Sequence, residues 1–301
     1  TARRAALALL LAVVSATLSA FVVGWWLHSP EPEFHKSVGM ITGSYIGGTP
    51  NLASVGVALD VSPETLAVTN ASEVLWSGLY LLLLLRLGPA LVRRFLPRTP
   101  RKQQAQQVAA PQRAQLTLRR GVRALALALV LVALSAGLGY AYQQLRLALG
   151  MPPKLADDIL VPAIIVALST LSVAASFIPA VRRLKGTEPI ADYLILCFAF
   201  AFGLMVDATE LVTGSGDVVA FTGWMLLLTL VLYYGLCRLV RMDADTAIMV
   251  SSACVFSPPL LPPIAEALGN RGILLTGIAA SILGFAIGNY MGLVVAGLLA
   301  P

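Results

Sequence analysis

Long runs of apolar residues, separated by short polar segments, fill most of this chain. A helix needs about 20 predominantly apolar residues to cross the roughly 30 Å hydrocarbon core of a bilayer. The runs that come close to or exceed this length cover residues 5–27, 66–85, 124–142, 159–180, 190–206, 218–239 and 273–299. The pattern predicts an all-α, polytopic membrane protein.

Two more apolar segments contain residues that break helices. Glycine adopts backbone angles that other residues resist, and proline lacks an N–H donor and disfavours helical geometry in the residue before it. We therefore expect the first segment to stop being helical near Gly47 and to restart near Asn51. The segments and their breaks are residues 38–59 with GGTPN at 47–51, and residues 247–268 with SPP at 257–259 and PP at 262–263.

The composition indicates that lipid is the main solvent. Hydrophobic residues make up 58% of the chain and charged residues 12%, and the mean hydropathy is +0.83. A soluble domain of 301 residues could not hide that much apolar surface. The net charge of +6 does not indicate a nucleic-acid partner, because the basic residues cluster in loops between apolar runs, as in the positive-inside pattern. We expect a multi-pass protein of the bacterial inner (plasma) membrane, whose cysteines are buried thiols: Cys197, Cys237 and Cys254.

An internal repeat becomes visible when the sequence is shifted by 209 residues. Residues 5–27 then align with 214–236, and the segment 38–59 aligns with 247–268. A span, an interrupted helix and a second span thus occur twice in the same order, although few residues are identical. Three more spans precede the second copy, so we expect that the first repeat lacks about three N-terminal helices.

This order of elements divides the chain into three parts. Residues 1–92 form a partial first repeat, with a span, an interrupted helix and a span. Residues 93–123 are polar and rich in Gln and Arg, and we expect a basic cytoplasmic linker there, with a lipid-headgroup or regulatory patch as the alternative. Residues 124–301 form the second repeat, with four spans, an interrupted helix and a final span.

The interrupted helices either cross the membrane or enter and return. If they cross, the two repeats have the same orientation, and the basic residues fall on both sides. If they are re-entrant hairpins, the repeats are inverted and the basic loops all fall on one side, which satisfies the positive-inside bias. Inverted structural repeats are common in secondary transporters. We favour the re-entrant form, and broken helices that cross are the alternative.

Irregular backbone survives at membrane depth only against protein or water, because an unpaired peptide group costs several kcal/mol in lipid. Each break exposes carbonyls of one half-helix, which attract cations, and amides of the other, which attract anions. We expect both breaks to face one shared polar cavity. The alternative is that Gly and Pro only kink packed spans. The candidate binding residues are Ser44, Gly47, Gly48, Thr49 and Asn51 at the first break, and Ser252, Ser257 and Pro258 at the second.

Polar groups elsewhere in apolar segments are candidates for binding ions. Glu266 follows the second break and could take a proton or sodium. Asn289 lies in the final span, and Glu73 lies in the matching span of the first repeat, where exposure to headgroups is an equal alternative. We expect no cofactor other than a sodium ion. No nucleophile with a base, no metal-ligand spacing and no nucleotide-binding glycine motif is present in the sequence, so we do not expect an enzyme.

Several segments resemble one family. GSYIGGTPNLASVGVALDV from Gly43, LGFAIGNYMGLVVAGLL from Leu283 and GLMVD at 203–207 are similar to motifs of the integral membrane proteins called domain of unknown function 819. That family is grouped with the cation–proton antiporter and anion transporter superfamily. The resemblance implies inverted repeats, a mobile core that carries both interrupted helices, and a homodimer. It implies no substrate.

The chain departs from the family's pattern at the second break. Relatives carry a glycine-rich motif there, whereas this chain has Phe256 at the position that matches Gly47, and Leu260 at the position that matches Asn51. The hypothesis from the sequence is a secondary active transporter of a small organic solute, with an anion favoured, coupled to sodium or proton by alternating access. The alternative is a membrane ligand-binding or sensor protein that uses the same central pocket without transport.

Overall fold

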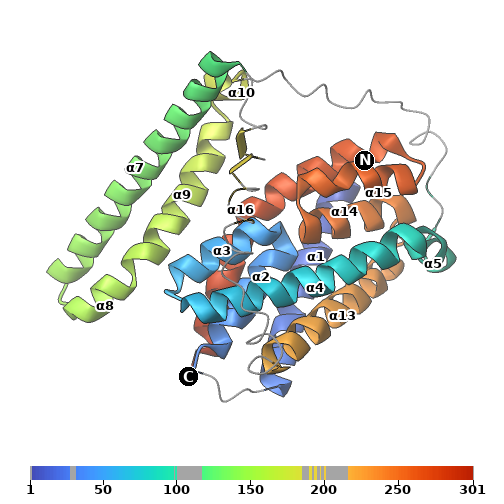
Figure 1. Ribbon diagram of the computed structural model, residues 1–301, viewed down its shortest axis with the longest axis horizontal. Helices are drawn as coiled ribbons and strands as arrows, with labels where there is room; N and C mark the ends of the chain where they lie inside the picture. Colours follow the sequence, from blue (N-terminus) through green and yellow to red (C-terminus); the bar gives the residue numbers. More distant parts are fainter. Residues whose placement is uncertain are drawn as a thin grey trace. The chain divides into compact units, whose positions relative to one another are not determined.

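The computed structural model describes residues 2–27, 32–97, 99, 117–184, 190–191, 193–194, 197, 200 and 216–300, and its regular structure over these residues is entirely helical (Figure 1). The chain forms two compact units. One comprises residues 1–56, 61–110 and 205–301, and the other comprises residues 57–60 and 111–204.

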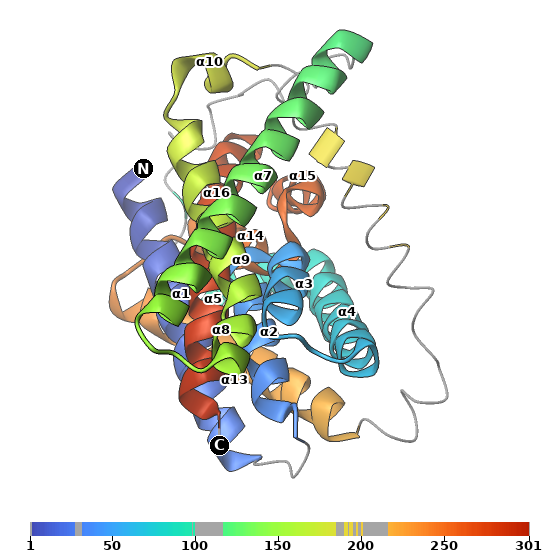
Figure 2. The same cartoon turned by 90° about the vertical axis from the view of Figure 1, so that its left-hand side faces the viewer.

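The smaller unit is built on two long helices that are packed side by side (Figure 2). Helix α7 covers Leu118–Ala148 and α9 covers Leu160–Ser176, with the short helices α8 (Pro153–Asp158) before α9 and α10 (Pro179–Arg182) after it. Gln143 donates a hydrogen bond to Asp157 Oδ1 at 2.7 Å across the turn that joins them. The predicted span at 190–206 lies largely outside the described residues. The prediction that Cys197 is a buried thiol is wrong, because it is exposed, whereas Cys237 and Cys254 are buried as expected.

The larger unit contains the remaining helices and both predicted helix breaks. Its elements are α1 (Ala2–Trp26), α2 (Phe34–Gly47), α3 (Thr49–Ala58), α4 (Pro63–Arg86), α5 (Gly88–Phe95), α13 (Gly216–Leu239), α14 (Ala244–Phe256), η1 (Pro258–Leu260), α15 (Leu261–Ala267), η2 (Arg271–Ile273) and α16 (Leu274–Leu299).

The prediction of a polytopic helical membrane protein is confirmed. Among the described residues, 6 helical segments are long and apolar enough to cross a bilayer, and each contains or overlaps a run predicted from the sequence. They are Arg3–Trp26, Pro63–Arg86, Arg119–Ala148, Pro153–Ser176, Gly216–Leu239 and Arg271–Leu299.

The core of the larger unit is formed by α2 and α14. Every residue of α14 is buried, and in α2 all residues except His35 and Lys36 are buried. The surrounding helices α1, α4, α13 and α16 instead keep many large apolar side chains exposed, such as Leu18, Leu82 and Leu283. In a bilayer such a face is solvated by acyl chains. The two helices that lead to the breaks are therefore shielded from lipid by protein, together with Gly48 and Ser257 themselves, as irregular backbone at this depth requires.

Helices α2 and α16 approach each other through glycines (Figure 1). A Cβ atom on Gly39 would lie 2.6 Å from the Gly292 carbonyl oxygen, and one on Gly47 would lie 2.6 Å from the Gly284 oxygen. A Cβ atom on Gly284 would collide with the carbonyl oxygen of Ile46. Small residues at every fourth position bring helix backbones together, which is a common mode of packing within membranes.

We predict that Gly284→Ala destabilises the protein by about 1–3 kcal/mol, the usual cost of overpacking a tight contact. The added methyl group meets backbone, which cannot move aside as a side chain can. The matched control is Gly297→Ala on the same helix, where a Cβ atom has nothing within 4 Å. Thermal unfolding in detergent measures both variants. Equal stability of the two would contradict the glycine contact.

Candidate functional site

The first break lies at one residue. Helix α2 ends at Gly47, Gly48 has φ 84° and ψ 179°, and α3 begins at Thr49. The positive φ is favoured only by glycine. The sequence predicted that the helix restarts near Asn51, but α3 begins two residues earlier, at Thr49. The earlier start is possible because proline is tolerated in a first helical turn, whose N–H groups have no helical partner.

The second break lies at Ser257, between the end of α14 and the short helix η1. Ser257 has φ 66° and ψ 165°, a conformation that residues other than glycine rarely adopt. Its hydroxyl oxygen is buried and makes no hydrogen bond with any described residue. The prolines that follow, Pro262 and Pro263, fall in the first turn of α15, where the missing N–H is not needed.

The two breaks touch each other. A Cβ atom on Gly48 would collide with the Ser257 hydroxyl oxygen, and the Ser257 backbone nitrogen would lie 3.4 Å from it. Positions 48 and 257 differ by the same 209 residues that align the two halves of the sequence. Only glycine fits at position 48, because a side chain would meet both an unfavourable φ and the serine.

The two ends of the α2–α3 pair are held together by Glu33, which immediately precedes α2. Its carboxylate accepts hydrogen bonds from Ser62 N at 3.2 Å, from Ser62 Oγ at 2.6 Å and from Lys36 Nζ at 3.0 Å. Ser62 is the N-cap of α4 and lies just after α3. The chain therefore leaves the α3 end close to where it entered α2.

The ends of the α14–α15 pair are held together by Asp245 in the first turn of α14. Its buried carboxylate accepts from Asn270 Nδ2 at 2.9 Å, in the loop after α15, and from Arg93 Nη2 at 2.9 Å. Arg93 also donates to the Leu268 carbonyl oxygen at 2.7 Å. The sequence places Arg93 in the basic linker 93–123, but it lies in α5, which continues to Phe95; residues 100–116 lie outside the described part of the chain.

Helices α2 and α14 begin at opposite ends of α1. Near the N-terminus of α1, Arg4 Nη1 lies 3.7 Å from the carboxylate of Asp243, the N-cap of α14. Near its C-terminus, a Cβ atom on Gly24 would lie 3.6 Å from Val38, in the first half of α2. At 1.5 Å per residue, these two contacts are separated by about 30 Å along the α1 axis.

The structure brings most of the predicted site residues to this place. Ser44, Gly47, Gly48 and Ser257 are buried at the breaks, and Thr49 directly follows. Asn51 is 3% exposed, and its amide nitrogen donates to the Phe285 carbonyl oxygen at 3.0 Å. That bond fixes Asn51 against α16, where a Cβ atom on Gly288 would collide with its amide.

The other predicted residues are placed differently. Ser252 is buried, but its hydroxyl donates to the Ile248 carbonyl oxygen of its own helix at 2.7 Å. Pro258 is half-buried beside Ser257, and Asn289 is half-buried next to Gly288. Glu266 is exposed and pairs with Arg271 at 3.2 Å, so nothing connects it with the buried breaks. The binding roles of all these residues stay predictions.

Phe256 packs away from the break that it precedes. Its ring stacks on Tyr80 of α4 with centroids 5.4 Å apart and planes at 19°. The Tyr80 hydroxyl lies 3.1 Å from Ser251 Oγ and 3.2 Å from the Tyr234 hydroxyl. Helix α14 is thus attached to α4 by aromatic and hydroxyl contacts. In the alignment of the two sequence halves, α2 corresponds to α14 and α16 to α4, and α2 and α16 meet through glycines instead.

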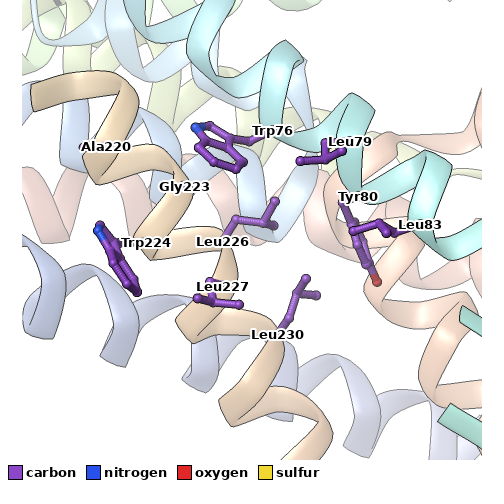
Figure 3. Close-up of a pocket in the computed structure, with 10 residues that line it drawn as sticks. All are labelled: Trp76, Leu79, Tyr80, Leu83, Ala220, Gly223, Trp224, Leu226, Leu227 and Leu230. Carbon is purple, nitrogen blue, oxygen red and sulfur yellow. The ribbon is translucent and has the colours of Figure 1, made fainter. Parts of the chain in front are cut away.

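Two cavities lie between α4 and α13. The first has a volume of about 450 Å³ and is lined mainly by leucine and aromatic side chains, among them Trp76, whose N–H donates to Val219 O (Figure 3). The second, of about 630 Å³, is lined by α4, α5 and α13 and extends to Arg238. Neither is lined by Gly48 or Ser257. These cavities suit hydrocarbon rather than a polar solute.

These features define a class of protein: a helical membrane protein with several candidate spans, in which two buried helix breaks are in contact. The chain belongs to the family described as protein of unknown function (DUF819), whose model matches residues 1–300. It is similar to "Uncharacterized membrane protein YjcL" of Bacillus subtilis (strain 168), with 22% identity over 295 residues that cover 96% of this chain and 74% of the relative. No solved structure matches the chain significantly.

We predict that the Glu33 contact stabilises the protein in a pH-dependent way. Burial alone would raise the pKa of Glu33, but hydrogen bonds from Ser62, Thr65 and Lys36 outweigh it and lower the pKa from 4.5 to about 2. A lowered pKa means that the stabilisation is complete above pH 4.5 and is lost as the pH falls towards 2. Glu33→Gln should therefore be less stable than the natural protein at neutral pH, by a margin that shrinks over this range. Glu64→Gln, at an exposed site in the first turn of α4, should show no such change.

We also predict that Arg93→Ala destabilises the protein by about 3 kcal/mol or more, because it leaves a buried carboxylate without its cation. Asp245 is 0% exposed, whereas the Arg93 side chain is 35% exposed. Arg94→Ala is the matched control, since Arg94 is exposed on the same helix. Chemical unfolding monitored by circular dichroism measures both. Equal losses for the two variants would show that the buried pair contributes nothing.

Proposed function

We propose that the protein is a secondary active transporter of a small organic solute, favouring an anion, coupled to sodium or proton by alternating access. The observation that carries the proposal is the contact between the buried breaks at Gly48 and Ser257. In secondary transporters, substrate and coupling ion bind near the bilayer midplane at such discontinuous helices. We further propose a homodimer in the bacterial inner membrane, with no enzymatic reaction.

The proposal includes two re-entrant hairpins in inverted repeats. Three observations support it: the ends of α2–α3 meet at Glu33 and Ser62, the ends of α14–α15 meet at Asp245 and Asn270, and the pairs begin at opposite ends of α1. Hairpins entering from opposite sides would meet at their tips, as Gly48 and Ser257 do. This arrangement also supports the place of the family in the cation–proton antiporter and anion transporter superfamily.

The chemistry of the tips suits a small charged solute. The N-terminus of α3 begins at Thr49 and carries amide dipoles that favour an anion. The last carbonyl groups of α2 and α14 favour a cation. The hydroxyl groups of Ser44 and Ser257 are buried without a hydrogen bond among the described residues, so they can bind a ligand without first breaking an internal contact.

A membrane sensor that binds a ligand without moving it is the second candidate. The stacking of Phe256 on Tyr80, with the hydroxyl contacts between Tyr80 and Ser251, attaches the second hairpin to α4. Such an attachment opposes the movement of the hairpin that transport needs. A ligand that binds tightly but crosses no membrane would favour this candidate.

The experiment begins with a thermal-shift screen of the purified protein against organic acids and amino acids, with and without sodium. Compounds that raise the unfolding temperature are then tested for uptake into proteoliposomes under sodium and proton gradients. We predict that Gly48→Ala reduces uptake by at least about tenfold, because a shift of 1.4 kcal/mol at the tip already changes an equilibrium tenfold. Gly235→Ala, where a Cβ atom has nothing within 4 Å, is the control. Uptake that is independent of both gradients would contradict secondary transport.

A further inference from the structure

One carboxylate in the larger unit is almost fully buried and takes part in no ion pair among the described residues. Glu73 lies near the middle of α4, a helix long and apolar enough to span the bilayer, and it is 1% exposed. None of the ion pairs among the described residues includes it. A carboxylate at the centre of a span costs about 2.5–3.5 kcal/mol on insertion scales, so such residues usually have a function.

The surroundings of Glu73 are polar but neutral. The hydroxyl groups of Ser44 on α2 and Ser77 on α4 lie beside its carboxyl group. Even so, Glu73 Oε1 and Ser44 Oγ are both buried and make no hydrogen bond of normal geometry with a described residue. A buried carboxylate oxygen without a hydrogen-bond partner is a place where a proton can be bound.

The titratable groups nearby do not neutralise the carboxylate. Tyr45 of α2 interacts electrostatically with Glu73, but its hydroxyl donates instead to the Thr222 carbonyl oxygen of α13 at 3.3 Å. On α13, Tyr233 donates to the Ala247 carbonyl oxygen and Tyr234 contacts Ser251. On α5, Arg93 binds Asp245 and Arg94 is exposed. On α15, Glu266 binds Arg271.

Glu73 is connected with the tip of the first hairpin through one residue. Ser44, whose hydroxyl lies beside the carboxyl group, accepts the hydrogen bond of Gly48 N on its backbone oxygen at 2.6 Å. Gly48 in turn contacts Ser257 at the second break. Ser44 lies one helical turn before Gly48, where the two hairpin tips meet. A change of charge at Glu73 is therefore felt one turn from the contact between the tips.

We propose that Glu73 carries the coupling proton: its carboxylate takes up a proton from water on one side of the membrane and releases it to water on the other. This inference rests on the proposed transport function and names its coupling ion. A proton removes the buried charge by forming one O–H bond, which can be donated to Ser44. A proton needs a single acceptor oxygen, whereas a hard metal cation needs several oxygen ligands.

The first test measures protonation directly and needs no substrate. Infrared difference spectra of the protein in liposomes, titrated from alkaline to acidic pH, should show the C=O stretch of one buried carboxylic acid that exchanges slowly with D₂O. Glu73→Gln should remove this band, whereas Glu64→Gln on the exposed first turn of the same helix should keep it. Glu73→Asp should keep a shifted band, which controls for misfolding of the glutamine variant.

The opposite results overturn the proposal. A carboxyl group that stays ionised, or stays protonated, over the whole titration cannot carry a proton. Displacement of the band by sodium, but not by potassium, at constant pH would assign the site to sodium instead. These results are independent of flux. If the band titrates but no gradient drives uptake of any compound, the transport function fails while proton binding stands; if uptake is proton-driven in Glu73→Gln, the inference about Glu73 fails while the transport function stands.

The second test reports whether the proton acts on the hairpin tips. Cys254 is 1% exposed and lies one turn before Ser257, and its labelling by a membrane-permeant thiol reagent can be followed after Cys197→Ser and Cys237→Ser. Because the thiolate is the nucleophile, the labelling rate rises with pH in any variant. The rate in this background, divided by the rate after Glu73→Gln is added, should therefore change several-fold with pH. A ratio that stays constant with pH would overturn the connection between Glu73 and the tips.

Discussion

The requirement that backbone polar groups be paired, or shielded from lipid, governs this structure. Two helices stop in the middle of the larger unit, and each stop leaves peptide groups that hydrocarbon cannot solvate. The protein meets the requirement by burying α2 and α14 among the other helices and by placing one break against the other, at Gly48 and Ser257. The positive φ at Ser257 indicates that this contact is kept at the expense of local strain.

The carboxylates of the larger unit differ in role because their surroundings differ. Glu33 and Asp245 are bound by donors from a neighbouring loop and hold the two ends of a helix pair together. Glu266 has an exposed partner, and an exposed pair contributes little to stability. Glu73 is buried beside the hydroxyl groups of Ser44 and Ser77 and takes part in no ion pair among the described residues. Glu33 and Asp245 therefore stabilise the fold, whereas Glu73 is the carboxylate that we propose to bind a proton.

The sequence predicted the apolar helices well, since apolar length is a local signal. Glycine and proline indicated where α2 and α14 end, but not where helix resumes: α3 begins at Thr49 and not near Asn51, and the break predicted at Pro262 and Pro263 is wrong, because both lie inside α15. The sequence could not separate Glu73 from Glu266, because burial depends on which face of a helix meets its neighbour. It also could not show that Phe256 turns towards Tyr80, or that Glu33 reaches Ser62 across 29 residues, because both are tertiary contacts.

The glycine contact between α2 and α16 has a mechanical consequence. Where backbones pack this closely, a small shear displacement of the α2–α3 pair along the common axis is opposed mainly by the hydrogen bond from Asn51 to the Phe285 carbonyl oxygen. A displacement of α14 relative to α4 would instead have to separate the stacked rings of Phe256 and Tyr80. Sliding of the α2–α3 pair along α16 is thus opposed by a polar contact, and sliding of α14 along α4 by an aromatic one.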